Sequence, residues 1–78
     1  MKLATSPQEL DLATIGQLTA ERRRRGWSLR WVADQAGFST ATLMRYERGS
    51  NVPDMYALAD WADVFGYDLL VGLRERAS

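Results

Sequence analysis

The most constraining feature of this sequence is the short distance between its helix-ending and helix-starting residues. Twice, a glycine is followed two residues later by a serine, as Gly26-Trp27-Ser28 and as Gly37-Phe38-Ser39. Glycine ends helices because it adopts the left-handed conformation easily, and serine begins them because its hydroxyl accepts a hydrogen bond from a free amide of the first turn. The pattern therefore predicts short helices joined by tight turns.

Apolar spacing and capping residues place four helices, which we expect at about 7–25, 28–36, 40–48 and 54–65. The first is expected to begin with a capping box in which Ser6 and Glu9 satisfy each other's amides and Pro7 occupies the first turn. The last carries its apolar side chains at helical spacing, namely Met55, Leu58, Trp61, Ala62 and Phe65. The sequence thus predicts an all-α bundle of four to five helices.

The C-terminal residues follow a different period. Leu69, Val71 and Leu73 alternate with other residues, which is typical of a strand, here expected at about 67–75. A single strand leaves its backbone groups unpaired, and the sequence offers no second strand. We therefore expect these three apolar residues to form a dimer interface with another copy of the chain.

Length and composition limit the classes of protein that remain. Seventy-eight residues of balanced composition fit one folded domain over residues 1–78. The sequence has no cysteine and no histidine, so disulfides, zinc fingers, thiol nucleophiles and imidazole bases are excluded. Lys2 is the only lysine, and no pair of carboxylates has a spacing typical of acid–base catalysis. We therefore expect that the chain is not an enzyme and that it binds neither a cofactor nor a metal ion.

Apolar stretches are short throughout the sequence. The longest runs from Leu69 to Leu73, far below the roughly 20 residues that span a bilayer. Residues 1–6 lack the apolar core of a signal peptide. The expected compartment is the cytoplasm.

Charge is distributed unevenly although lysine plus arginine and aspartate plus glutamate both number ten. Residues 22–50 carry seven arginines and two acidic residues, a net charge of +5, between flanks of −2 and −3. A local basic segment, rather than net charge, makes an electrostatic footprint for nucleic acid. The run from Arg22 to Arg25 is consistent with phosphate contacts by Arg23 to Arg25 and equally with a solvated helix end.

Two short helices around a glycine-containing turn form the helix-turn-helix pattern. Val32-Ala33, the turn Ala36-Gly37-Phe38-Ser39 and the segment from Thr42 to Gly49 make this pattern more specific. With these motifs, residues 14–66 resemble the Xre/Cro-type family of λ-repressor-like DNA-binding domains. The resemblance implies that the helix at 40–48 enters the major groove of double-stranded DNA.

The resemblance also implies roles for particular side chains. Arg45 is the strongest candidate for specificity, because an arginine can contact O6 and N7 of guanine together. The residues expected to face base edges are Thr40, Ala41, Met44 and Arg45. The residues expected to contact phosphates, which position the protein without specifying sequence, are Ser28, Arg30, Ser39, Thr42, Arg48 and Asn51. For each serine and threonine, helix capping is the more common role and is compatible with phosphate contact.

Four positions bear on how closely the chain follows this family. Arg22 and Glu47 occupy the positions of the family's structural ion pair, although both could be solvated surface charges. Leu29 stands where the family often has a phosphate-contacting glutamine, and Arg30 is a possible substitute. Trp31 stands at a usually polar position, so we expect it to pack under a chain end or to meet a partner.

Three functions are compatible with these residues. The first is a dimeric, sequence-specific transcriptional regulator, mainly a repressor, that reads a palindromic operator. The second adds toxin neutralisation to DNA binding, because the start of the first helix and the C-terminal strand resemble HipB-type antitoxins. The third is a protein-interaction module without DNA, using Trp31 and the acidic last helix. The basic segment favours the first two.

Overall fold

The computed structural model describes the backbone of residues 7–70 and the side chains of residues 12–70. It contains four helices in this range, α1 (Pro7–Arg25), α2 (Leu29–Ala36), α3 (Thr40–Arg48) and α4 (Met55–Val64). They lie within one residue of the predicted positions and make the fold all-α. The predicted capping by Ser6 falls outside the described residues.

The tight turns have the geometry that the Gly–Ser spacing predicts. Ser28 and Ser39 have extended backbones, and each side chain accepts from the amide three residues later, at 3.0 Å. Gly37 has a left-handed φ of 83°, and its amide donates to carbonyls of the last turn of α2. Asp54 caps α4 in the same way, through the Ala57 amide at 2.8 Å. The turns before α2 and α3 thus each end one helix and start the next within three residues.

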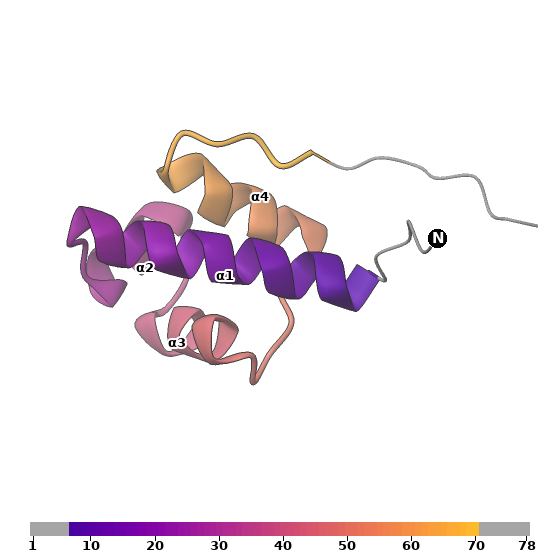
Figure 1. The fold of residues 1–78 in the computed structure, drawn as a ribbon. Coiled ribbons are helices and arrows are strands. Elements are labelled where there is room, and N and C mark those ends of the chain that lie inside the picture. The colour runs from indigo at the N-terminus through magenta and orange to yellow at the C-terminus, as the bar shows by residue number, and fades with distance from the viewer. Residues whose placement is uncertain (1–6, 71–78) are drawn as a thin grey trace, which may run out of the picture.

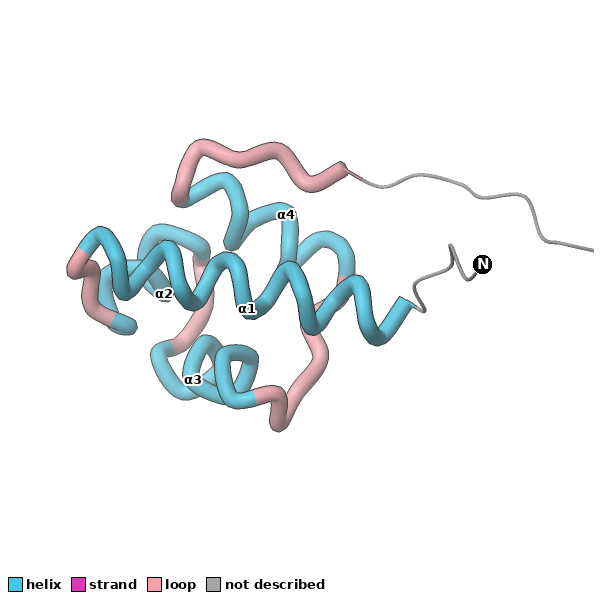
Figure 2. Tube along the Cα trace, viewed as in Figure 1, coloured by secondary structure: helices cyan, strands magenta, loops and turns pink. Residues whose placement is uncertain are grey.

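The core lies where all four helices meet. α2 packs against α3 and α4, while the longer α1 crosses the bundle and contacts α3 (Figures 1 and 2). The largest fully buried side chains are Trp61, Leu43 and Val32. Ala33 is also fully buried, and its small side chain lets α3 approach α2 closely. Leu58, Trp61 and Ala62 of α4 and the cap residue Phe65 are buried as predicted, but Met55, the first residue of α4, is exposed.

The segment Tyr67–Leu70 continues past α4 and runs beside α1 (Figure 1). It has no regular secondary structure in the single chain. Leu69 packs against the core, whereas the side chain of Leu70 is 87% exposed. The strand was predicted at about 67–75, paired with a second copy of the chain, and its residues 71–75, with Val71 and Leu73, lie outside the described residues.

Candidate nucleic-acid interface

The helix α3 has one face anchored in the core and one face open. Leu43 is fully buried, and the Tyr46 ring meets the Phe38 ring edge to face at a centroid distance of 5.4 Å. These contacts fix the rotation of α3 about its axis. The side chains predicted to face bases therefore lie on the outer side: Thr40, Ala41 and Arg45 are exposed, and Met44 is half-buried.

The side chains predicted to contact phosphates lie at helix starts and in one loop. Ser28 and Ser39 cap α2 and α3, and the Ser39 hydroxyl also donates to Thr42 Oγ1 at 2.8 Å. Arg30 and Arg48 are exposed. Asn51 is exposed in the loop after α3, where its backbone N–H donates to the Arg45 carbonyl at 3.4 Å. Helix starts present free N–H groups, so they suit anions such as phosphate.

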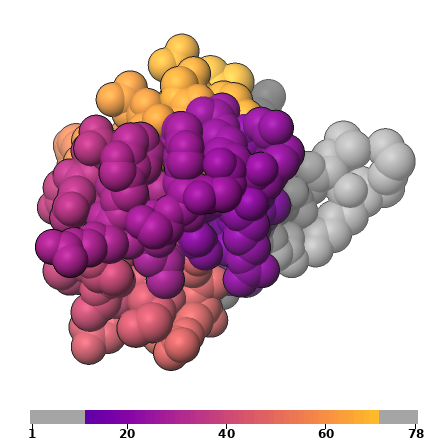
Figure 3. All heavy atoms as spheres, turned by 90° about the vertical axis from the view of Figure 1, so that its left-hand side faces the viewer, coloured from indigo at the N-terminus to yellow at the C-terminus, as the bar shows by residue number. Residues whose placement is uncertain are grey.

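The exposed arginines of this surface have no acidic partner among the described residues. Within the part of the chain that the structure describes, neither Arg30 nor Arg45 nor Arg48 forms an ion pair. Figure 3 shows the coral α3 region at the bottom of the molecule and the orange-yellow α4 region at the top. The exposed arginines on α3 therefore lie apart from Asp60 and Asp63, which are exposed on α4.

Arg22 and Glu47 lie in contact and join α1 to the end of α3. Arg22 Nε is 2.7 Å from Glu47 Oε2, and Arg22 Nη2 is 2.9 Å from Glu47 Oε1, a bidentate pair. A third donor of the guanidinium contacts the Trp27 carbonyl at 3.0 Å. The Glu47 carboxylate raises the pKa of Arg22. Because both side chains are at least 86% buried, removing one partner would strand a charge, at a cost of about 3 kcal/mol.

The neighbouring arginines do not share one role. Arg24 and Arg25 both pair with Glu21 on the previous turn of α1. Arg25 also donates to the Phe65 carbonyl at 3.2 Å and lies 4.9 Å from the centre of the Trp27 ring. Arg23 is exposed and, among the described residues, has no acidic partner. Of the three arginines considered for phosphate contact, Arg23 is thus the one whose charge is uncompensated.

Two departures from the family pattern have structural explanations. Leu29 is half-buried and packs against the core, so an apolar side chain suits this position. Trp31 packs on Trp27, with ring centroids 4.6 Å apart, and Trp27 stacks in turn on Phe65. This aromatic cluster was missed at the sequence level. Only the i, i+4 spacing of the two tryptophans could have indicated it.

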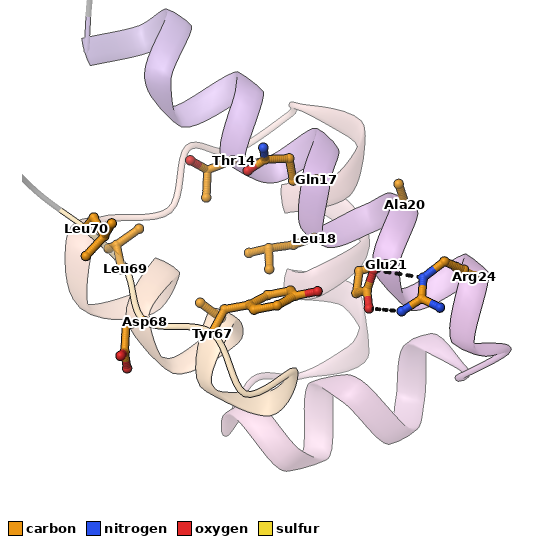
Figure 4. A pocket seen from close by; sticks show the side chains of 11 residues that line it. Thr14, Gln17, Leu18, Ala20, Glu21, Arg24, Tyr67, Asp68, Leu69 and Leu70 are labelled. Atoms are coloured by element: carbon orange, nitrogen blue, oxygen red, sulfur yellow. Dashed lines mark hydrogen bonds and ion pairs between the residues drawn. The ribbon is translucent and has the colours of Figure 1, made fainter.

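A groove on the other side of α1 was also not predicted. It has a volume of about 690 Å³ and lies between α1 and Tyr67–Leu70. Figure 4 shows Thr14, Gln17 and Glu21 along its helical side and Leu18 at its floor. The described residues contain neither a cluster of metal-ligating side chains nor a helix long and apolar enough to cross a membrane.

The short helix α2, the turn at Gly37 with its left-handed backbone, and α3 with one buried and one exposed face together define a helix-turn-helix domain. The model of a helix-turn-helix domain family matches residues 16–77, so the chain belongs to this family, and its resemblance to the Xre type is confirmed. The chain is also similar to a protein named HTH-type transcriptional regulator AnsR, from Bacillus subtilis (strain 168).

The two sequences are 39% identical over 51 residues, which are 65% of this chain. The aligned region is 44% of the AnsR sequence, so the chain spans less than half the length of that relative. No solved structure matches the chain.

Proposed function

We propose that this chain is a sequence-specific transcriptional regulator that binds double-stranded DNA through α3. The observation that carries the proposal is the outer face of α3. There Arg45 and Arg48 are exposed and have no acidic partner among residues 12–70, while Leu43 anchors the helix. A rigidly held helix with free arginines fits the major groove, which admits an α-helix. The printed name of the similar protein, a transcriptional regulator, supports the same function.

The regulator acts as a dimer on a palindromic operator. A single α3 of nine residues makes too small a contact for specific affinities of about 10⁻⁸ M or tighter. Two copies related by a two-fold axis read half-sites about 34–36 Å apart. Leu69, Val71 and Leu73 form the dimer interface in this proposal. Repression follows from occupancy, because a dimer on an operator blocks other proteins from the same DNA.

The test compares two exposed arginines of α3. Arg45→Ala should weaken operator binding by about 1–3 kcal/mol and relax the preference at one base position, because Arg45 contacts a base edge. Arg48→Ala should weaken binding to all sequences and reduce the slope of log K against log salt by about one, because Arg48 contacts a phosphate. Binding of both variants to a randomised palindromic site, at several salt concentrations, separates the two roles.

The control is Asp60→Asn, since Asp60 is exposed on α4, away from α3. An Arg45→Ala protein with an unchanged sequence preference would remove Arg45 from base recognition. Failure of the wild-type chain to select any duplex sequence would refute the proposed function.

A further inference from the structure

We infer that Arg23, near the end of α1, binds a phosphate of the DNA backbone and so extends the interface beyond α2 and α3. The inference rests on the proposed function and adds a DNA-contacting residue to it. Four consecutive arginines form the last turn of α1, and the structure gives them different surroundings. Which of them can bind a phosphate depends on its partners and on the side of α1 that it occupies.

The partners separate Arg23 from its neighbours. Three of the four arginines pair with carboxylates of the chain, Arg22 with Glu47 and both Arg24 and Arg25 with Glu21. Arg23 is exposed and forms no ion pair among residues 12–70. A paired guanidinium has to leave its carboxylate before it can bind a phosphate, whereas Arg23 only exchanges water for the phosphate oxygens. Arginine binds phosphate through two parallel hydrogen bonds, so Arg23 is chemically suited to this contact.

The rotation of α1 places Arg23 on the side of α3. Arg22 points to Glu47 at the end of α3. Successive residues of an α-helix are turned by about 100° around its axis, so Glu21 and Arg23 lie on opposite flanks of Arg22. Glu21 lines the groove beside Tyr67–Leu70. Figure 1 shows α4 and this segment on one side of α1 and α3 on the other, so Arg23 is turned toward the side of α3.

The contacts of Arg22 show what lies beside the end of α1. Its guanidinium binds the carboxylate at the end of α3 and the carbonyl just before α2 begins, which belong to Glu47 and Trp27. The residues that directly follow these two partners in the sequence, both proposed to contact phosphates, are Ser28 and Arg48. The DNA backbone beside α2 and the end of α3 therefore comes close to Arg23 as well.

This contact fastens α1 itself to the DNA. The Arg22–Glu47 pair joins α1 to α3, so a phosphate bound at the end of α1 restricts how α3 lies in the major groove. Phosphate contacts position a protein without reading its sequence. Arg23 therefore strengthens binding to every duplex and contributes to the salt dependence of binding.

The experiment compares two adjacent arginines in the full chain. Arg23→Gln and Arg24→Gln each remove one positive charge from an exposed position, so they change the net charge equally. Arg24 pairs with Glu21 and lines the groove, on the flank away from Arg23. Arg23→Gln should reduce the slope of log K against log salt by about 0.9 for each copy bound, whereas Arg24→Gln should keep the wild-type slope.

Two duplexes of about 20 base pairs, long enough for two half-sites one helical turn apart, serve as probes. One carries the sequence that the wild-type chain selects, and the other is unrelated. Arg23→Gln should weaken binding to both by the same factor, about three- to tenfold at 50 mM salt and less at 200 mM. Arg23→Lys should retain the wild-type slope, because lysine also neutralises one phosphate. Equal slopes for Arg23→Gln and Arg24→Gln would overturn the contact.

Thermal unfolding distinguishes a DNA contact from a role in the fold. Arg23→Gln should melt no lower than Arg24→Gln, because only the second change removes an ion pair seen in the described residues. A lower melting temperature for Arg23→Gln, or weaker binding with an unchanged salt slope, would assign Arg23 to the fold and overturn the contact.

These outcomes are separate from those of the proposed function. A wild-type chain that selects no duplex sequence but loses salt dependence in Arg23→Gln would refute the sequence-specific function and support the contact. A wild-type chain that selects a duplex sequence, with Arg23→Gln and Arg24→Gln behaving alike, would support the function and refute the contact.

Discussion

Glu21 is the most heavily hydrogen-bonded carboxylate among the described residues. It accepts from Arg24 and from Arg25, the latter at 2.7 Å, and these hydrogen bonds lower the pKa of Glu21 from 4.5 to about 2. A carboxylate with a lowered pKa stabilises the folded state fully above its unfolded value. This stabilisation declines as the pH falls below about 4.5 and is lost below about 2.

We therefore expect Glu21→Gln to lower the melting temperature at pH 6 but not at pH 2. The two melting temperatures should converge as the pH falls from 4.5 to 2, because Glu21 takes up a proton below about 4.5 in the unfolded state but only near 2 in the folded state. Thermal unfolding followed by circular dichroism across this pH range measures the difference. Asp60→Asn, at an exposed α4 position, should follow the wild type throughout. A difference that stays constant down to pH 2 would contradict the role given to these hydrogen bonds.

Individual side chains also show which contacts could not be predicted from the sequence. The outward position of Arg45 was predicted, because it follows from helical spacing relative to Leu43. The sharing of Glu21 by Arg24 and Arg25 was not predicted, although all three lie within one turn. The four consecutive arginines look equivalent in the sequence. What distinguishes them is tertiary: Arg22 faces Glu47 of α3, and Arg25 reaches the Phe65 carbonyl at the end of α4.

The helices and turns follow from local signals, which explains why their bounds were predictable within a residue. A serine cap and a left-handed glycine act within one turn of their own position, so the sequence contains the necessary information. The groove beside α1 was not predictable in this way. It depends on where Tyr67–Leu70 settles after α4, and Leu69 settles on core residues that are distant in sequence.

Two glycines give a matched test of the turn between α2 and α3. Gly37→Ala should destabilise the chain by about 1–2 kcal/mol, because φ is 83° and a Cβ disfavours that conformation. Gly16→Ala, inside α1, should stabilise it by about 0.5–1 kcal/mol through helix propensity. A Cβ at either position would meet no atom within 4 Å, so steric clashes do not contribute to the difference in stability between the two variants. Denaturant unfolding of the three proteins should give midpoints on opposite sides of the wild type.

Equal midpoints for Gly37→Ala and the wild type would show that the turn relaxes to another conformation. The tight α2–α3 geometry would then not depend on this glycine.

For the whole molecule, shortening the C-terminal end of the chain should separate the residues needed for folding from those needed for dimerisation. A chain stopped after Leu70 keeps every contact that the structure describes and lacks the residues that pair in the proposed dimer. It should remain helical, sediment as a monomer and lose operator binding by orders of magnitude. A chain stopped after Gly66 should also lose about 1 kcal/mol of stability, because Leu69 no longer covers the core.

Analytical ultracentrifugation and thermal unfolding of both shortened chains provide the measurements. A chain stopped after Leu70 that still sediments as a dimer would place the dimer interface within residues 7–70 or at the N-terminus. Val71 and Leu73 would then be excluded from the dimer interface.

The opposite placement of free arginines around α3 and aspartates along α4 has a kinetic consequence. A molecule with zero net charge feels little overall attraction to DNA, but a molecule with its positive and negative sides separated feels a torque in the field of the phosphates. Approaching DNA, the chain would rotate until α3 leads and α4 trails. Fewer encounters are then spent in unproductive orientations, and this alignment weakens once the Debye length, about 8 Å at physiological salt, becomes shorter than the domain.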